Sequence, residues 1–314
     1  MVAYVLRRLL GVVPVLVLVA LGSFLLVHLV PGDPAMVMLG SDATPQQVEQ
    51  LRTQMGLDRS LPEQFILWVR EVLRGNLGES FFLGRPVTQA LVERLPATMQ
   101  LAVLSLVFSL LIGIPAGIVA AVRQNSRWDQ IVMLTAMGGI SIPSFWLGLA
   151  MILIFSVGLG WLPSGGYTPL SEDFWQGLRT LIMPGISLGF MQAALIARMT
   201  RSSMLEVLRQ DYVRTARAKG LRKATVILRH SLKNAMIPVI TTVGTAFGVL
   251  LGGAVIVEIV FTYPGLGRLV VLAVQRRDYP LVQGALLLTS VIYVAVNLAV
   301  DLLYSVFDPR IKYE

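Results

Sequence analysis

The sequence predicts an all-α, polytopic membrane protein with six transmembrane helices and both termini in the cytoplasm. Of its 314 residues, 55% are hydrophobic and only 14% are charged, whereas soluble domains carry about 25% charged residues. The apolar residues gather in runs of roughly 20, the length that crosses a bilayer. The longest basic segment between two such runs, residues 198–234, indicates a cytoplasmic position because Lys and Arg set the orientation of spans.

The composition also argues against several kinds of site. The chain has no cysteine and only two histidines, His28 and His230, so disulfides, thiolate metal sites and Cys nucleophiles are excluded. It has no G-x-x-x-x-G-K-[ST] phosphate loop. We expect no catalytic residue, no metal and no cofactor in this chain. The net charge of +8 lies largely in residues 198–234 and needs no nucleic acid to explain it.

Residues 1–30 are predicted to form an uncleaved first transmembrane helix. Arg7 and Arg8 precede a nearly unbroken apolar run of about 22 residues, which is longer than the core of a signal peptide. The run ends at the turn Pro31-Gly-Asp-Pro34. We therefore place the N-terminus in the cytoplasm, and we expect His28 to be a packed residue near the outer membrane surface.

Residues 31–98 are predicted to form a helical cap on the outer side of the membrane. Thr44 and Gln47 fit a capping box at the start of a first short helix, which Gly56 ends. A second amphipathic helix is expected over residues 62–74. The cap either covers the outer ends of the spans or forms a docking surface for an external protein, and the sequence leaves both open.

Residues 99–306 are expected to form a core of five further spans, followed by a cytoplasmic tail, residues 307–314. The approximate limits of these spans are 99–122, 130–157, 181–197, 235–262 and 282–304. Small residues four apart let helices approach closely, and they occur at Gly113 and Gly117 and again from Gly244 to Gly252. With this topology, the cytoplasmic segments carry sixteen basic residues and the outer segments carry ten.

The third span contains a proline, Pro143, near its middle. A proline there frees a backbone carbonyl, which is tolerated where protein or a water-lined cavity satisfies it. This stretch is therefore a candidate wall of a membrane pathway, although a simple packing kink explains it equally well. Glu258 is a further candidate, or else a structural partner for a nearby cation. The candidate pathway residues are Ser141, Pro143, Ser144, Phe145, Trp146 and Glu258.

Residues 198–234 hold ten basic residues and only two acids. Within them, the stretch from Asp211 has helical spacing, and Gly220 follows where a C-cap glycine would stop the helix. One face of this helix carries Tyr212, Thr215, Ala216 and Lys219. A short helix with small side chains, held between two spans, suits docking into a groove of a soluble partner. The alternative is a solvated basic loop that only anchors orientation.

The stretch from Asp211 to Gly220 carries the most specific resemblance in the chain. It resembles the cytoplasmic motif of the permease subunits of bacterial ABC importers, in which Glu-Ala-Ala is followed by three residues and Gly. Here Arg214-Thr215-Ala216 stands before Gly220 at that spacing, so Glu is replaced by Arg and the first Ala by Thr. Other matches to the dipeptide, oligopeptide, glutathione and nickel branch follow in order along the chain: Arg7-Arg8-Leu9, Pro31-Gly-Asp-Pro34, Phe261-Thr-Tyr-Pro-Gly-Leu-Gly267, Arg277-Asp-Tyr-Pro280 and Asp308-Pro-Arg310.

The resemblance implies a type I ABC importer permease fold in a bacterial inner membrane. It further implies a heterodimer with a second related permease, two cytoplasmic ATPase subunits that bind ATP and Mg²⁺, and an external solute-binding protein. The implied function is to form the translocation pathway for di- or oligopeptides or related small solutes by alternating access. The residues implied to couple to the ATPase are Tyr212, Arg214, Thr215, Ala216, Arg217, Lys219, Gly220 and Leu221.

Two other functions compete with this interpretation. An ion-gradient-driven secondary transporter needs acids or broken helices near the membrane midplane. Glu258 and Asp301 are the acids within the predicted spans, and they lie near helix ends. An intramembrane hydrolase needs a nucleophile and a base at membrane depth, and His28 has no matching Ser signature.

Overall fold

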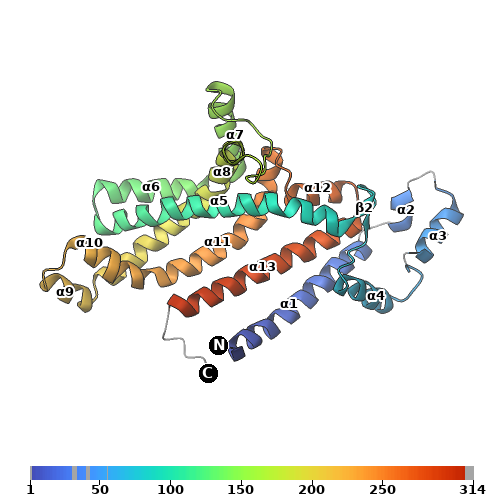
Figure 1. The fold of residues 1–314 in the computed structure, drawn as a ribbon, viewed down its shortest axis with the longest axis horizontal. Helices are drawn as coiled ribbons and strands as arrows, with labels where there is room; N and C mark the ends of the chain where they lie inside the picture. Colours follow the sequence, from blue (N-terminus) through green and yellow to red (C-terminus); the bar gives the residue numbers. More distant parts are fainter. Residues whose placement is uncertain (1, 30–33, 40–42, 55, 308–314) are drawn as a thin grey trace. The chain divides into compact units, whose positions relative to one another are not determined.

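The computed structural model describes residues 2–29, 34–39, 43–54 and 56–307 (Figure 1). Helices make up most of this part of the chain, and its strands form one hairpin of two two-residue strands, which confirms the predicted all-α class. The turn at residues 30–33 and the tail at 308–314 lie outside the described residues. The chain divides into two compact units. One runs up to Pro96 and adds Arg268–Val294; the other comprises Ala97–Gly267 and the end of the last helix.

The first unit contains the first helix and most of residues 31–98, the predicted cap. Its elements are α1 (Val2–Leu29), α2 (Pro34–Leu39), α3 (Pro45–Gln54), α4 (Leu61–Leu73), β1 (Glu79–Ser80), β2 (Arg85–Pro86), the start of α5, most of α12 (Leu266–Gln275) and the first half of α13 (Tyr279–Phe307). Helix α4 packs on α1 through aromatic rings, with the centroid of Phe24 5.3 Å from Phe65 and 5.9 Å from Trp68. His28 Nε2 lies 3.1 Å from Gln64 Oε1, so His28 is a packed residue as expected.

Both helices of the predicted cap begin with a capping box, and the sequence analysis indicated the one at Thr44. Thr44 N donates to Gln47 Oε1 over 2.9 Å, and Gln47 N donates back to Thr44 Oγ1 over 3.4 Å. Glu63 likewise accepts a hydrogen bond from the backbone of Ser60. Gly56, which follows α3, has a φ of 66°, a conformation that glycine adopts without strain. The two predicted helices of the cap are therefore confirmed.

A buried carboxylate, Asp278, holds the hairpin to the loop between α12 and α13. Ser80 Oγ donates to Asp278 Oδ2 over 2.5 Å, and the backbone N–H of Phe82 donates to the same oxygen over 3.1 Å. The guanidinium of Arg276 lies 5.1 Å from the ring centre of Phe82. The Arg277-to-Pro280 match in the sequence thus has a structural role in the first unit, because it contains Asp278.

The second unit is built around α8 (Phe174–Leu208). In the most apolar stretch of this helix, 72% of the residues are buried. The other elements of the unit are the main part of α5 (Val87–Val122), α6 (Arg127–Ser141), α7 (Ser144–Met151), the π-helix η1 (Ile152–Gly158), α9 (Asp211–Ala218), α10 (Lys223–Thr225), the π-helix η2 (Val226–Ser231) and α11 (Leu232–Val260). Helices α6, α7 and α11 all contact α8 (Figure 1).

Glycines bring the backbones of α5 and α8 together. A Cβ atom added at Gly117 would lie 2.6 Å from the carbonyl oxygen of Ala197, and one at Gly113 would lie 2.7 Å from that of Ala193. One turn before Gly113 in the same interface, Ser109 Oγ of α5 donates to the carbonyl oxygen of Gly189 in α8 over 2.7 Å. The predicted close packing at Gly113 and Gly117 is therefore confirmed.

Of the predicted glycine stripe on α11, only some residues pack closely against another helix of this chain. Gly252 faces open space, whereas a Cβ at Gly253 would meet Leu188 Cδ1 of α8 at 3.2 Å. Among the described residues of this chain, the predicted packing is therefore found at Gly253 and not at Gly252. The face of α11 that meets α8 is set by the neighbouring buried residues Leu250, Leu251 and Ala254.

Two helices extend beyond the spans predicted within them. Helix α5 begins at Val87, before the predicted span at 99–122, and α8 runs from Phe174 to Leu208, beyond the predicted span at 181–197. Most of residues 198–234 are also helical. Arg and Met favour helix formation, and the long Arg side chains keep their charges at the surface while the helix continues. Charge density marked the end of the apolar run, not the end of the helix.

The predicted third span is broken in two. Helix α6 and the continuous stretch Ser144–Gly158 meet at 102°, with Pro143 preceding α7. The described residues contain four helices long and apolar enough to cross a membrane, or five if this bent pair is one span. Helix α1 extends over 28 residues, and its described apolar stretch is Leu10–Leu26. The six predicted spans are compatible with this set.

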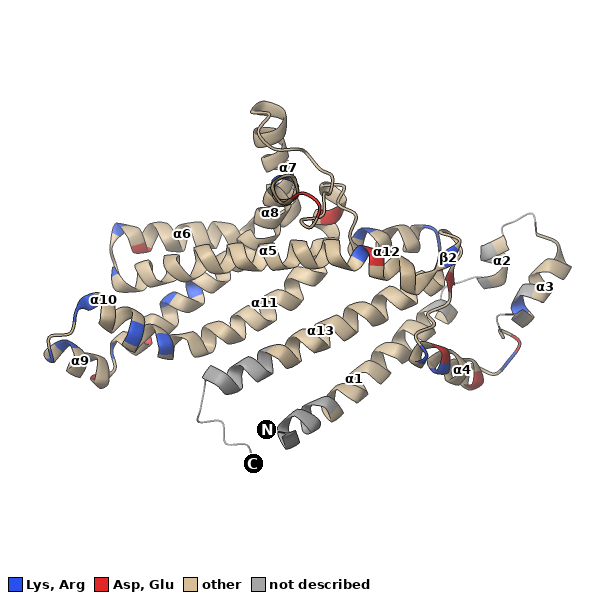
Figure 2. Ribbon diagram, viewed as in Figure 1, with Lys and Arg blue, Asp and Glu red and all other residues tan. Residues whose placement is uncertain are grey.

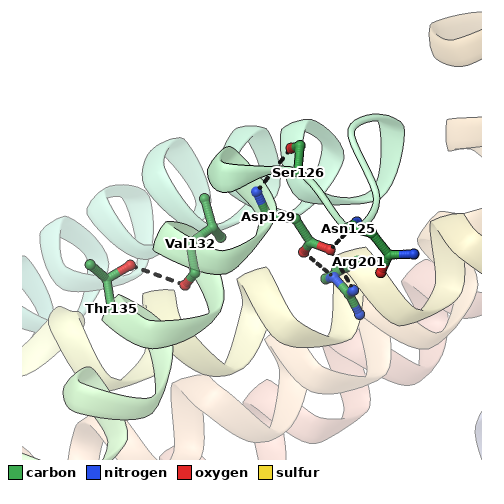
Figure 3. Close-up of polar contacts among 6 residues, drawn as sticks. All are labelled: Asn125, Ser126, Asp129, Val132, Thr135 and Arg201. Carbon is green, nitrogen blue, oxygen red and sulfur yellow. Dashed lines mark hydrogen bonds and ion pairs between the residues drawn. The ribbon is translucent and has the colours of Figure 1, made fainter.

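An ion pair joins the first turn of α6 to α8 (Figure 3). Arg201 Nε and Nη2 donate to the two carboxylate oxygens of Asp129 over 2.6 and 2.8 Å. The backbone N–H of Asn125 donates to Asp129 Oδ2 over 2.9 Å, and Ser126 caps α6 through its hydroxyl. The carboxylate is 5% exposed and its partner 24%. This pair fixes the α5–α6 turn on α8 and was missed by the sequence analysis.

We expect Gly117→Ala to destabilise the protein by about 1–3 kcal/mol, because the new methyl group overpacks the α5–α8 contact. Gly138→Ala on α6 is the matched control, since nothing lies within 4 Å of a Cβ there. That control should be neutral or slightly stabilising, because Ala favours helix over Gly. Thermal unfolding in mild detergent measures both. Equal melting of the two variants would contradict the close contact.

We expect Arg201→Ala to cost about 2–3 kcal/mol, because it leaves the buried carboxylate of Asp129 without its guanidinium partner. Arg198→Ala on the same helix is the control, because Arg198 is exposed and should tolerate the change. The double variant with Asp129→Ala should lose less than the sum of the two single changes. Additive losses would show that the two side chains are not coupled.

Candidate coupling segment and membrane pathway

The predicted short helix from Asp211 is present as α9, Asp211–Ala218. It starts one turn after the end of α8 and has an acid, Asp211, in its first turn, where a negative charge is favourable. Gly220 follows the helix with a φ of 75°, the left-handed conformation expected of a residue that ends a helix. Nothing lies within 4 Å of a Cβ built at Gly220, so this position borders open space.

One face of α9 is anchored to the rest of the second unit. Val213 is 0% exposed and Ala216 is 8% exposed, and both pack with Val226 of η2. Val207 and Leu208 at the end of α8 cover the same cluster. Helix α9 is therefore fixed at once to the end of α8 and to the segment that leads into α11.

The opposite face of α9 is open and basic. Figure 2 shows Lys and Arg gathered around α9 and α10. Of the eight predicted coupling residues, seven are exposed: Tyr212, Arg214, Thr215, Arg217, Lys219, Gly220 and Leu221. The eighth, Ala216, is buried within this chain. Sequence spacing grouped Ala216 with Tyr212 and Thr215, but the structure places it on the anchoring face with Val213.

Two polar contacts reinforce this arrangement. The hydroxyl of Tyr212 accepts a hydrogen bond from Asn234 Nδ2 over 2.8 Å, which ties α9 to the first turn of α11. Thr215 Oγ1 donates to the carbonyl oxygen of Asp211 over 3.0 Å. Tyr212 thus combines a partly exposed ring, 42% accessible, with a fixed orientation.

A cleft of about 440 Å³ lies beside α9. Arg217 and Lys223 supply its positive charge, and Val122, Leu208, Leu221, Val226 and Ile227 supply apolar walls. Long basic side chains around an apolar floor suit a partner that offers both an acid and an apolar side chain. The cleft therefore extends the exposed face of α9 into a larger surface.

The break in the third span opens onto a second, smaller cavity of about 190 Å³. Ser141, Pro143 and Ser144 line it, together with Gln192 of α8 and Leu250 of α11. Three of the predicted pathway residues are thus brought together. Phe145 and Trp146 do not line this cavity, and their side chains are 43% and 54% exposed.

Glu258, the remaining predicted pathway residue, does not line this cavity. It is 0% exposed and accepts a hydrogen bond from Thr98 Oγ1 over 2.6 Å, while Leu266 N donates to the same hydroxyl over 2.8 Å. Gly265 lies so close to the carboxylate that a Cβ there would overlap it. Of the two readings of Glu258, the structure favours the structural one, in which it anchors the loop containing Phe261 to Gly267.

The part of the chain that the structure describes contains no group of three His, Cys, Asp or Glu side chains that could hold a metal ion. The side chain of Asp301, the other acid considered for an ion-driven mechanism, lies outside the described residues. The geometry thus offers an exposed basic surface at one end of α8 and, near its middle, a mostly apolar cavity that Ser141, Ser144 and Gln192 also line.

Known protein families match this chain along nearly its whole length. Residues 113–313 match the family described as binding-protein-dependent transport system inner membrane component, and residues 1–102 match the N-terminal part of such membrane components. A dipeptide transport system permease protein of Alkalihalophilus pseudofirmus is 44% identical over 333 residues. A glutathione transport system permease protein of Escherichia coli K12 is 46% identical over 315 residues. Both alignments cover 100% of each chain.

The solved structures extend the likeness to the fold. The inward-facing MetNI methionine ABC transporter matches with a TM-score of 0.58 and 20% sequence identity, over 70% of this chain and 97% of that chain. These matches confirm the family resemblance, and the apolar helices agree with a multi-pass protein of the bacterial inner membrane. The chain belongs to the family of binding-protein-dependent transport system inner membrane components.

Proposed function

We propose that this chain is the permease subunit of an ATP-driven importer and that α9 couples it to a cytoplasmic ATPase. The observation that carries the proposal is the two-sided character of α9. Its inner face, Val213 and Ala216, is anchored to the ends of α8 and η2, whereas its outer face is exposed and basic. Such a helix is fixed in its own chain and still available to a partner.

The exposed residues around Thr215 and Gly220 would enter a surface cleft of the ATPase subunit. Gly220 adds no side chain where the two backbones approach, and its positive φ is unstrained in glycine. Arg214, Arg217 and Lys219 would face acids on the rim of that cleft. Ala216 contributes indirectly, because its small side chain lets α9 lie close against Val226.

Motion of α9 would reach the membrane through the helices that it touches. Helix α8 ends at Leu208, and the hydrogen bond from Asn234 joins Tyr212 to α11. When ATP closes two ATPase subunits, a displacement of α9 would tilt α8 and α11 and move the pathway from inward- to outward-open. ATP and Mg²⁺ would be bound entirely by the ATPase subunits.

The proposed substrates are di- or oligopeptides or glutathione, and two relatives named as dipeptide and glutathione transport system permease proteins support this class. An external solute-binding protein would deliver them, and a second related permease would complete the pathway. The runner-up, an ion-gradient-driven transporter, gains no support from Glu258, because that carboxylate is buried and hydrogen bonded to Thr98.

We expect Gly220→Asp to leave the chain folded in the membrane and to reduce substrate-stimulated ATP hydrolysis of the assembled transporter at least about tenfold, the effect of losing one contact worth about 1.4 kcal/mol. The matched control is Gly220→Asn, because Asn and Asp both tolerate a positive φ and differ in charge. It should retain more stimulation than Gly220→Asp. Normal stimulation in Gly220→Asp would contradict the coupling role.

A further inference from the structure

The cavity at the break between α6 and α7 contains a polar side chain without a partner. Gln192 lines the cavity and is only 2% exposed. Its side-chain amide makes no hydrogen bond to another described residue, and its amide atoms border the cavity instead of being fully enclosed. Leu188 and Met191 beside it are apolar, so the amide of Gln192 is the hydrogen-bonding side-chain group that α8 presents to the cavity.

Gln192 also stands close to the middle of α8, which runs from Phe174 to Leu208. A polar residue in the middle of a membrane helix is expensive, and such residues typically face a pathway or a partner. The neighbouring polar residue on α8, Ser187, is different, because its hydroxyl donates to the carbonyl oxygen of Ser144 over 2.6 Å. Gln192 is thus distinguished from its neighbours by the lack of an internal partner.

The start of α7 borders the same cavity. Pro143 and Ser144 line it, and Pro143 provides no side-chain cap for the first turn of the helix. The free N–H groups and the dipole of a helix N-terminus attract anions. Broken membrane helices often bind anionic substrate groups in this way. The cavity therefore joins an uncapped helix N-terminus to an unpaired amide that can donate hydrogen bonds.

We propose that this cavity is a transient binding site for the terminal carboxylate of a peptide that passes through the permease. The amide of Gln192 donates to one carboxylate oxygen, and the N-terminus of α7 stabilises the negative charge. Ser141, which is exposed, lies at the wall of the site. The proposal rests on the proposed transport function for the identity of the ligand.

The size of the cavity fits this ligand. About 190 Å³ corresponds to roughly six water molecules at about 30 Å³ each. That space holds a carboxylate with one small side chain, but it is below the roughly 300 Å³ of a pocket for a complete small ligand. The remainder of the peptide would lie outside the cavity, and the lining residue Val249 is 51% exposed. A shallow site of this kind lets a substrate leave as well as enter.

The test uses the absence of cysteine in this chain. In the complete transporter, Ser141→Cys is labelled with a maleimide in the presence of alanylalanine, S-methylglutathione or the carboxyl amide of alanylalanine. Labelling of the permease chain is followed on a gel. We expect the two carboxylate ligands to slow labelling about threefold at twice their dissociation constant. The amide should protect much less.

Substitutions at Gln192 identify the group that binds. In the Ser141→Cys background, Gln192→Leu should require about tenfold more alanylalanine for equal protection, as expected for a lost hydrogen bond to a charged group. Gln192→Glu keeps the shape but repels the carboxylate, and it should also lose protection. Met191→Leu, another change in the cavity wall, should retain it. Thr135→Cys on the exposed face of α6 reports any effect away from the cavity.

Equal protection in Gln192→Leu and in the unsubstituted chain would overturn the proposal. So would equal protection by alanylalanine and its carboxyl amide, because the site would then not recognise the carboxylate. ATP-driven uptake of the same peptides is measured in parallel. Protection without uptake would contradict the proposed importer and support the binding site. Uptake without protection would support the importer and contradict the binding site.

Discussion

The close approach of α5 and α8 is the contact on which the second unit depends. In a membrane, lipid tails are as apolar as the helix surfaces, so helices associate through close packing and hydrogen bonds instead of hydrophobic burial. Gly113 and Gly117 allow α5 to reach the backbone of α8, and Ser109 donates across the same interface to Gly189. Helix α8, held in this way, then positions everything that we assign to function.

Both candidate functional features are attached to this one helix. Gln192 lies near its middle, and α9 begins shortly after its end at Leu208. Sixteen residues of helix separate these two positions, which is about 24 Å at 1.5 Å per residue. The ion pair between Arg201 and Asp129 fixes the α5–α6 turn between them. A movement of α9 would therefore be transmitted to the cavity by a helix that cannot easily bend.

Much of this arrangement could be predicted from local sequence rules. The capping boxes at Thr44 and Ser60, the small-residue spacing at Gly113 and Gly117, and the helix end at Gly220 all follow from short-range chemistry, and the structure has each of them. These features depend on residues within a few positions of one another. Long apolar runs likewise predicted the class of the protein, because they respond to the bilayer and not to any particular partner.

The features that escaped prediction depend on residues far apart in the chain. The Asp129–Arg201 pair spans 72 positions, and no spacing rule links its two members. Ala216 matches the exposed face of α9 by periodicity, yet its burial depends on Val226. The 102° bend at Pro143 could not be derived from the proline alone, since a kinked span fits the same residues. Gln192 was overlooked because a single glutamine in an apolar run has no sequence signature.

The most direct test of the account is to identify what the outer face of α9 contacts in the native membrane. A photo-crosslinking amino acid at Thr215, which is exposed, should capture a P-loop ATPase subunit. The same group at Phe81, which is 48% exposed and lies in the predicted cap, should not. Adducts formed from Thr215 are identified by mass spectrometry. Capture of an ATPase at Thr215 alone is the result that the account predicts. Capture of no ATPase at Thr215, with the protein intact in the membrane, would contradict its central claim.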